Sequence, residues 1–371
     1  MTCDAILLAS PGVRTLVPYE PGKPLDELER ELGIRDAVKL ASNENPYGPS
    51  PAAHAAAAAA LSGAARYPDG GGFTLKRALA RHLDVDSARI TLGNGSNDVL
   101  ELIARTFLAP GEIALCDAYA FAVYPLVVRA VGGQLLSIPA RDFAHDLDAM
   151  AAALSPVVRV VFLANPNNPT GTSFGHAALA RFLAACPATT LVVLDEAYCE
   201  YACGVAGYPD SRQLLDRHDN LIVVRTFSKA YGLAGLRVGY GVSSPAVAGL
   251  LNRVRQPFNV STAAQAAAVA ALADEGYMRD VVEKTNAGRE ALRAQLAARG
   301  LAVLPSAGNF LCVDVGDGGR FYEALLRQGV IVRPLGPYKM PRHIRVTIGT
   351  EAENSRFLQA LDIVTRAAHD T

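Results

Sequence analysis

The chain has 371 residues, half of them apolar, which is enough for a large core and too long for one ordinary domain. Its 35 basic and 36 acidic side chains nearly cancel, and no basic stripe or polybasic run indicates a nucleic acid or an anionic membrane as a partner. This balance favours a small-molecule substrate.

The first twelve residues carry no basic segment ahead of their short apolar stretch, so we expect no secretory leader. Charges, proline or glycine interrupt every longer apolar run, so we expect no membrane span. No two of the six cysteines form a C-x-x-C pair, and no histidine pair follows Cys199 and Cys203 at zinc-site distances. We therefore predict reduced, mostly buried thiols in a cytoplasmic protein without a metal site.

Residues 1–50 are rich in proline, charge and turn signals, which predicts an arm that lies over the body of the protein. Residues 52–61 are helical by propensity, and residues 96–107 repeat apolar side chains at helical spacing after a polar start. Short apolar runs then follow, with helical patterns between several of them: residues 112–116, 159–164, 191–194, 221–224 and 238–241. Buried strands joined by helices favour an α/β domain with a mostly parallel sheet.

The pattern changes after about residue 270. Three helices are expected there, at residues 278–299, at 321–328 and from about 351, with strands near 310–315, 330–332 and 344–348. These elements predict a smaller α+β domain. The expected division is an arm at 1–50 that packs with the small domain, a large domain at 51–270 and the small domain at 271–371.

The first motif with chemical content is Gly-Asn-Gly-Ser-Asn at residues 93–97, just before a predicted helix. Glycines let backbone N–H groups approach an anion, and a helix N-terminus adds partial positive charge. The motif predicts a phosphate-binding turn around Gly95, Ser96 and Asn97, although glycine-rich turns before helices are common.

The second motif is Asn-Pro-Asn-Asn-Pro-Thr-Gly at residues 165–171, after an apolar strand. This composition is typical of a turn. Open α/β sheets also bind their ligands at the carboxyl ends of strands, and Asn168 there can offer its amide to a phenolate oxygen.

The third motif follows the apolar run 191–194 and reads Asp195-Glu-Ala-Tyr198. An ionised carboxylate at the end of a buried strand is poorly solvated and needs a cationic partner. The protonated nitrogen of a pyridine ring is such a partner, and a protonated pyridine is the electron sink of pyridoxal 5′-phosphate (PLP) chemistry. The alternative is a helix N-cap.

The fourth motif places Ser228 and Lys229 after the strand 221–224, with Arg237 eight residues later. Lysines are usually exposed, but this one lies in an apolar, glycine-rich setting where burial lowers the amine pKa and frees it to attack a carbonyl. Arg237 can donate two parallel N–H groups to a phosphate that Ser228 also bonds, or it can be a member of an ordinary ion pair. The four motifs in this order indicate a PLP enzyme.

In these four motifs the sequence resembles the fold-type-I PLP-dependent aminotransferases, and most closely their histidinol-phosphate branch. The resemblance covers nearly the whole chain, from residues 40–46 to residues 344–349. The branch is indicated by the short N-terminal arm, by Arg-Tyr-Pro-Asp at 66–69 and by Ser-Lys-Ala-Tyr-Gly-Leu-Ala-Gly-Leu-Arg-Val-Gly-Tyr at 228–240.

The resemblance implies a role for each motif residue. Lys229 would carry PLP as a Schiff base and shuttle the substrate proton, and Asp195 would bond the pyridine nitrogen. Tyr198 and Asn168 would hold the ring hydroxyl oxygen. The phosphate would be held by Gly95, Ser96, Asn97, Ser228 and Arg237, and Phe121 would stack on the ring, with Tyr119 and Tyr124 as neighbouring candidates.

The resemblance also implies the substrates and the assembly. Arg345 would take the carboxylate of glutamate, Tyr19 and Arg333 would lie near the far end of the substrate, and Asn43 and Asn168 would complete the substrate side. Tyr67 would reach the phosphate site of a partner subunit, which implies a homodimer with shared sites. The reaction would interconvert histidinol phosphate and 2-oxoglutarate with imidazole-acetol phosphate and glutamate.

Other functions stay open on the sequence. An aromatic amino-acid aminotransferase has substrates that also carry a flat ring and an anion, and a PLP-dependent decarboxylase of the cobalamin pathway could share the same residues. A PLP-fold binding or regulatory module is disfavoured by the near-neutral charge and the lack of an added DNA-binding segment. A nicotinamide-dependent oxidoreductase is disfavoured because no G-x-G-x-x-G follows the first strand.

Overall fold

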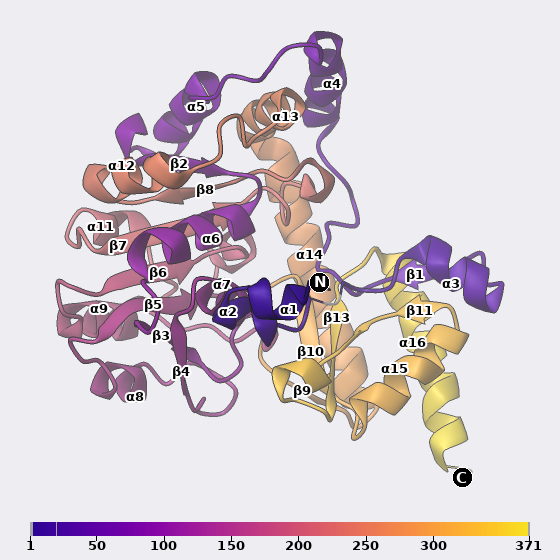
Figure 1. Cartoon of the computed structure of the whole chain (residues 1–371). Coiled ribbons are helices and arrows are strands. Elements are labelled where there is room, and N and C mark those ends of the chain that lie inside the picture. Colours follow the sequence, from indigo (N-terminus) through magenta and orange to yellow (C-terminus); the bar gives the residue numbers. More distant parts are fainter. Residues whose placement is uncertain (1–2, 20, 370–371) are drawn as a thin grey trace.

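The computed structural model describes residues 3–19 and 21–369, and its central element is a seven-stranded sheet of order β2-β8-β7-β6-β5-β3-β4 (Figure 1). Strand β8 is antiparallel to both its neighbours, and the other pairs are parallel. The predicted α/β fold with a mostly parallel sheet is confirmed. The strands are β2 (Ile90–Gly93), β3 (Ile113–Asp117), β4 (Gln134–Ile138), β5 (Val158–Ala164), β6 (Leu191–Asp195), β7 (Leu221–Thr226) and β8 (Gly239–Val242).

Helices cover both faces of this sheet because successive side chains of its buried strands point to opposite faces. Val160 and Phe162 of β5 face one core, which α6 (Ser96–Phe107), α7 (Val123–Ala130) and α12 (Pro245–Val254) close. Val161 and Leu163 face the other core. That second core is closed by α4 (Pro51–Ala60), α5 (Phe73–Leu83), α8 (Leu147–Ala152), α9 (His176–Ala185), α11 (Ser211–Leu215) and α13 (Thr262–Ala273).

A second part follows the long helix α14 (Glu275–Ala298), which Asp274 caps by accepting a hydrogen bond from the Tyr277 backbone N–H. An antiparallel sheet of order β12-β13-β10-β9 packs there with α15 (Gly318–Arg327) and α16 (Glu351–His369). Its strands are β9 (Ala302–Val303), β10 (Phe310–Asp314), β12 (Arg333–Pro334) and β13 (His343–Thr347). A smaller α+β unit near the C-terminus is therefore present, as predicted.

The first fifty residues contact both parts. The short helices α1 (Ala5–Leu8) and α2 (Pro11–Arg14) lie in front of the large sheet in Figure 1, and α2 packs on α7. Strand β1 (Val38–Lys39) instead pairs with β11 (Val330–Ile331) in the second part. Before it, α3 (Leu25–Leu32) buries Leu28 against Ile331, a helix that charge and turn signals alone did not predict.

Strands β2 and β4 were also missed. Strand β4 is an edge strand with Gln134, Leu136 and Ser137 exposed, so it has no continuous buried run. The remaining short elements are α10 (Cys199–Ala202) and the 3₁₀ turns η1 (Leu61–Gly63), η2 (Ser87–Arg89), η3 (Ala234–Leu236) and η4 (Gly336–Tyr338). Over residues 3–19 and 21–369, every helix is too short or too polar to cross a lipid bilayer.

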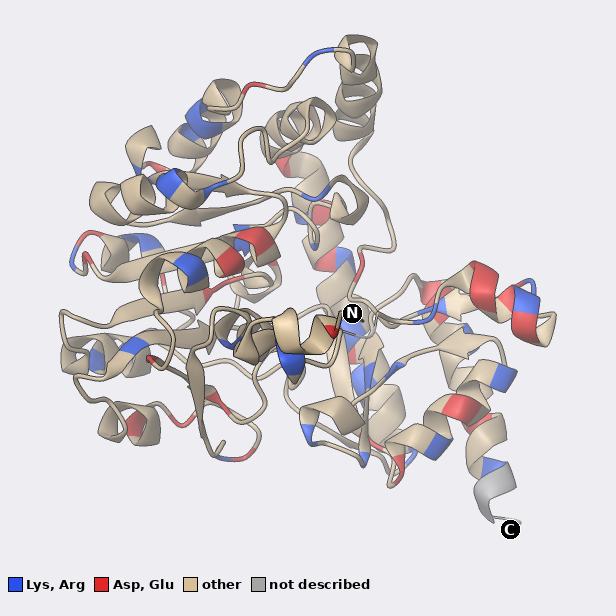
Figure 2. Cartoon of the chain, viewed as in Figure 1, with Lys and Arg blue, Asp and Glu red and all other residues tan. Residues whose placement is uncertain are grey.

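Acidic and basic side chains are intermixed on both parts of the fold. Figure 2 shows Lys and Arg mixed with Asp and Glu on both parts, without a continuous face of one sign in that view. The even mixture agrees with the near-zero net charge of the sequence.

Candidate active site

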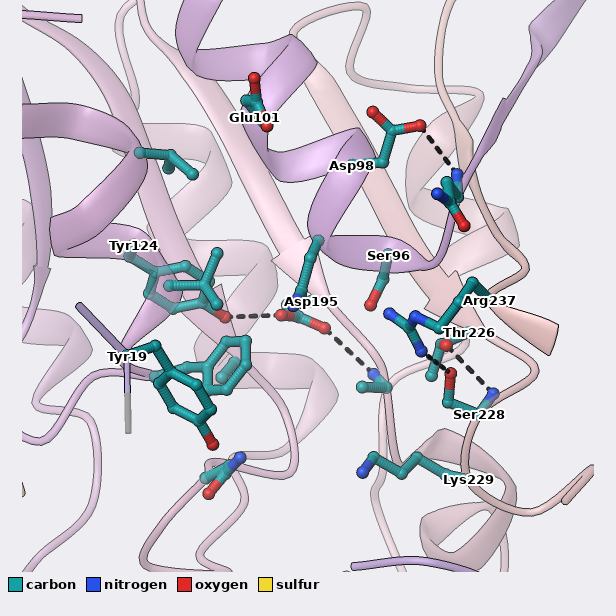
Figure 3. A pocket seen from close by; sticks show the side chains of 18 of the residues that line it. Tyr19, Ser96, Asp98, Glu101, Tyr124, Asp195, Thr226, Ser228, Lys229 and Arg237 are labelled. Atoms are coloured by element: carbon teal, nitrogen blue, oxygen red, sulfur yellow. Dashed lines mark hydrogen bonds between the residues drawn. The ribbon is translucent and has the colours of Figure 1, made fainter. Parts of the chain in front are cut away.

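A cavity of about 830 Å³ opens at the carboxyl edge of the large sheet (Figure 3). Parallel strands β5, β6 and β7 pair in register, with Ala164 opposite Asp195 and Asp195 opposite Val224, so the segments that follow them meet at one edge. The N-terminus of α6 forms another wall, and Tyr19, Ser42, Asn43 and Arg345 complete the lining from outside the large sheet.

Asp195 ends β6 with its carboxylate buried in this cavity. The Tyr124 hydroxyl donates to Oδ2 over 2.7 Å, and the Ala197 backbone N–H donates to Oδ1 over 3.2 Å. Burial raises the pKa of Asp195 to about 6, despite the hydrogen bond from Tyr124. The helix that follows has Tyr198 at its N-cap position, so Asp195 is not the cap of α10.

Lys229 lies just after β7, and its amine extends toward the middle of the cavity (Figure 3). The amine donates to the Ser42 carbonyl over 3.0 Å and lies 5.7 Å from the centre of the Tyr198 ring. Burial, followed by the positive charge of Arg345, lowers the pKa of Lys229 to about 7. A large fraction of this amine is therefore neutral and nucleophilic near neutral pH.

The Tyr198 hydroxyl is buried between two amides. Asn43 donates to it over 3.0 Å and Asn168 over 3.2 Å. Burial raises the pKa of Tyr198 to about 12, so the hydroxyl keeps its proton near neutral pH. Since both amides donate to its oxygen, the hydroxyl hydrogen remains available for an oxygen of a ligand.

The anion-binding end of the cavity consists of residues 95–97, Ser228 and Arg237. Helix α6 begins there without a side-chain cap, and Arg237 donates from Nη1 to Ser228 Oγ over 3.1 Å. Gly95 has φ +81° and ψ 168°, a backbone conformation that residues with a Cβ rarely adopt, so this position favours glycine. Backbone N–H groups, a hydroxyl and a guanidinium converge on one spot, as a phosphate requires.

The three aromatic residues that could stack on a cofactor ring differ in whether they line the cavity. Phe121 and Tyr124 line the cavity, whereas Tyr119 stacks on Phe143 at 5.5 Å and does not. The Tyr124 ring stacks on Phe162 at 4.7 Å inside the core, and Phe121 meets its edge at 5.7 Å. The two rings that line the cavity are therefore in edge contact with each other.

The opposite end of the cavity is built around Arg345 of β13. Its Nη1 donates to Asn168 Oδ1, and its Nη2 donates to the Ala41 carbonyl over 2.7 Å. Tyr19 lies on the same side, with the Arg333 guanidinium 5.4 Å from its ring centre. Two cationic groups thus lie at this end.

The structure brings most of the predicted residues to the cavity and leaves a few outside it. Its lining includes Tyr19, Asn43, Ser96, Asn97, Phe121, Asn168, Asp195, Tyr198, Ser228, Lys229, Arg237 and Arg345. Gly95 lies directly behind the lining, and Arg333 lies behind Tyr19. Tyr67 is 82% exposed, stacks on Phe258 at 4.7 Å and does not reach this cavity.

Several contributing groups escaped the sequence analysis. The Ser42 carbonyl holds the lysine amine, a backbone role without a sequence signal. Asn43 was expected on the substrate side, but its backbone contacts were not: it has φ +53°, its N–H donates to Thr347 Oγ1 over 2.9 Å, and Asn309 donates to its carbonyl over 3.1 Å. Tyr124 was considered only as a ring for stacking, yet its hydroxyl bonds Asp195.

The donor set fits PLP. A carboxylate can take the ring nitrogen, an amine of lowered pKa can take the aldehyde, and the uncapped start of α6 with Arg237 can take the phosphate. The cavity volume is also sufficient for a cofactor and a small substrate.

Comparison with known proteins gives the family. Residues 35–361 match the family model described as aminotransferase class I and II. A protein of Pseudomonas aeruginosa named histidinol-phosphate aminotransferase 2 is 58% identical over 370 residues, which cover 99% of this chain and 100% of that protein. One of Nitrosococcus oceani named histidinol-phosphate aminotransferase 1 is 52% identical over 358 residues, 96% of each chain.

Among solved structures, histidinol-phosphate aminotransferase from Sinorhizobium meliloti in complex with PLP is similar with a TM-score of 0.89 and 35% identity. The alignment covers 97% of this chain and 98% of that one. The predicted fold-type-I architecture and the predicted cofactor are confirmed by this similarity.

Proposed function

Because the chain belongs to the class I and II aminotransferases, and within them to the family of the histidinol-phosphate aminotransferases, we propose that it exchanges an amino group between glutamate and imidazole-acetol phosphate. The products are histidinol phosphate and 2-oxoglutarate, and the reaction is reversible. This places the enzyme in histidine biosynthesis.

One observation carries the proposal: a lysine amine with a pKa near 7, a buried strand-end carboxylate and an anion-binding helix start share a single cavity. Each feature is common alone, but PLP is a ligand that needs all three at once. The enzyme is PLP-dependent, like its class. When bound, PLP supplies the electron sink that stabilises negative charge developing at the substrate Cα.

We assign the cofactor end of the cavity to Asp195, Tyr198, Asn168, Lys229 and the anion-binding end defined above. Asp195 Oδ1 and Oδ2 keep capacity to accept an N–H, which would hold the proton on the ring nitrogen. The Tyr198 hydroxyl and the Asn168 amide would bond the ring oxygen. Phe121 would lie against the ring face.

Lys229 moves the proton that the reaction requires. With PLP and substrate bound, Lys229 Nζ would remove the proton from the substrate Cα and later return it, so this one amine would act first as base and then as acid. A pKa near 7 suits both steps, because the amine accepts and releases a proton with similar ease at neutral pH.

We assign the substrate end to Tyr19, Asn43, Arg333 and Arg345. Glutamate brings a carboxylate and histidinol phosphate brings a phosphate, and a guanidinium can bond either anion with two parallel N–H groups. Arg345 is only 4% exposed, so an anion there would be shielded from water and bound strongly.

We further propose a homodimer with shared sites. Tyr67 is largely exposed and is not part of the lining of its own cavity, as expected of a residue that serves a partner. The arm at 1–50, the large domain at 51–270 and the small domain at 271–371 are the proposed units, with the substrate end between them. The six cysteines are free, and Cys116, Cys199 and Cys312 are buried, which supports a cytoplasmic location.

The decisive experiment compares amino donors. Purified enzyme should show higher kcat/KM for histidinol phosphate than for phenylalanine, with 2-oxoglutarate as acceptor. A preference for phenylalanine would instead assign the chain to aromatic amino-acid aminotransfer, for which Phe121 and Tyr19 offer suitable surfaces. Failure of the protein to form a coloured complex with PLP would contradict the whole proposal.

A further inference from the structure

The turn at residues 93–97 is held by a polar cluster that consists of Asp98, Asn259 and Arg255, of which Asp98 and Asn259 also line the cavity. Asp98 Oδ2 accepts a hydrogen bond from the Asn94 backbone N–H over 2.7 Å and a second from Asn259 Nδ2 over 2.7 Å. Figure 3 shows the Asp98 carboxylate above Ser96 and Arg237, directed away from the cavity centre. Asp98 therefore bonds the turn through Oδ2 from the edge of the cavity.

Asn259 forms hydrogen bonds on both sides of the same turn. Its Nδ2 bonds the Leu92 carbonyl over 3.1 Å at the end of β2, as well as Asp98 in the first turn of α6. Arg255 fixes this amide by donating from Nη1 to Asn259 Oδ1 over 2.7 Å, and from Nη2 to the Gly70 carbonyl over 2.8 Å. The two ends of the turn are thus tied to one side chain.

This arrangement determines where the backbone N–H groups at the start of α6 point. The turn contains two glycines and therefore has many accessible conformations when it is not restrained. Anion binding requires several N–H groups to converge, so a mobile turn would bind phosphate more weakly. The Asp98 carboxylate uses one oxygen for both contacts, a geometry that a neutral amide oxygen can also provide.

We propose that Asp98, held by Asn259, is a positioning residue for the turn that binds the cofactor phosphate. The inference rests on the proposed function, in which this turn takes the phosphate of PLP. Its contribution comes from its hydrogen bonds and not from its charge.

The test compares PLP with pyridoxal, which has the same ring and aldehyde but no phosphate. Calorimetry on full-length protein freed of cofactor gives both affinities, and inorganic phosphate serves as a third ligand. Asp98→Ala should weaken PLP binding about tenfold, which corresponds to a loss of about 1.4 kcal/mol of binding free energy. The affinity for pyridoxal should change less than about twofold. The affinity for inorganic phosphate should fall in parallel with the affinity for PLP.

Two further variants separate geometry from charge. Asp98→Asn should restore PLP affinity to within about twofold of the parent, because its amide oxygen can accept both hydrogen bonds. Glu101→Gln removes a carboxylate that lines the same cavity one turn further along α6, and should leave the ratio of PLP to pyridoxal affinity unchanged.

Asn259→Ala should also weaken PLP more than pyridoxal, and it decides the question if Asp98→Ala does not fold. Equal losses for PLP and pyridoxal would overturn the inference, as would an Asp98→Asn variant as weak as Asp98→Ala. If the parent protein itself fails to bind PLP, it is the proposed function that fails.

Discussion

At the cofactor end, the polar side chains come from consecutive strand ends of one sheet, whereas at the substrate end they come from segments far apart in the chain. Asp195 and Lys229 follow neighbouring strands β6 and β7, so sheet register alone brings them together. Arg345 and the Ala41 carbonyl that it bonds are 304 residues apart.

The two ends also differ in the chemistry of their charged groups. Burial shifts the pKa values of Lys229 and Asp195 toward neutrality, to about 7 and about 6. Arg345 is instead bonded to Asn168 and to the chain backbone within the protein. The cofactor end is suited to proton transfer and the substrate end to binding an anion. Substitutions at the cofactor end should therefore lower kcat, and substitutions at the substrate end should raise KM.

The largest effect should come from Lys229→Ala, which removes the group that we propose moves the proton. Turnover should fall by about 10⁴-fold, the upper range for general acid–base catalysis, and the imine absorbance should disappear. Lys76→Ala, at a half-buried lysine on α5 outside the cavity, should leave both unchanged. Substantial turnover in Lys229→Ala would show that catalysis does not depend on the amine at the cofactor end.

Asp195→Ala should lower kcat by about 10²- to 10³-fold, the magnitude seen when one charge-stabilising group is removed, while some PLP stays bound. The control is Asp117→Ala, because Asp117 is another buried carboxylate at a strand end whose pKa burial raises to about 6. It does not line the cavity, so kcat should be nearly unchanged. Normal kcat in Asp195→Ala would show that the ring nitrogen has another partner.

Arg345→Ala should raise KM for glutamate by about 10²-fold, as expected for loss of a paired, charge-assisted contact, with a much smaller effect on PLP affinity. Arg289 is similarly buried but bonds Asn286 and the Gly308 carbonyl, so Arg289→Ala is the matched control. An unchanged KM for glutamate would place the carboxylate elsewhere.

The pH dependence of cofactor attachment sharpens the contrast further. The attacking amine must be neutral, and the pKa of Lys229 is lowered to about 7, so the neutral fraction rises as pH increases through that value. The attachment rate should therefore increase up to about tenfold per pH unit below 7 and level off above it. A rate that still increases beyond pH 9 would show that the pKa of Lys229 is not lowered.

The smallest effect is expected for Tyr124→Phe, which removes the hydroxyl that donates to Asp195 Oδ2. A hydrogen bond to a charged group is worth about 1.5 kcal/mol, so kcat should fall about tenfold. Tyr201→Phe removes a buried hydroxyl that does not line the cavity, and should leave kcat unchanged. Equal effects of the two substitutions would mean that Tyr124 acts only by packing.

The contrast between the ends also explains what the sequence could predict. Strands β5, β6 and β7 are continuous apolar runs, so Asn168, Asp195 and Lys229 were recognisable as residues at strand ends. Strand β4, exposed on the sheet edge, and the charged helix α3 lack such runs and were missed. Contacts through backbone carbonyls, such as Lys229 with Ser42, depend on tertiary packing and leave no residue pattern.

The roles of Arg345, Tyr19 and Arg333 could not be obtained from local pattern. No periodicity links positions 19, 333 and 345, and only the resemblance to a family suggested them. Tyr124 was visible in the sequence, but its bond to Asp195 depends on the packing of α7 against β5 through Phe162.

The most direct measurement identifies the lysine that carries PLP. Reduction of the holoenzyme with borohydride fixes the cofactor on its lysine, and peptide mapping by mass spectrometry locates it. The label should appear on Lys229 alone. A label on any other lysine, or no label at all, would contradict the account.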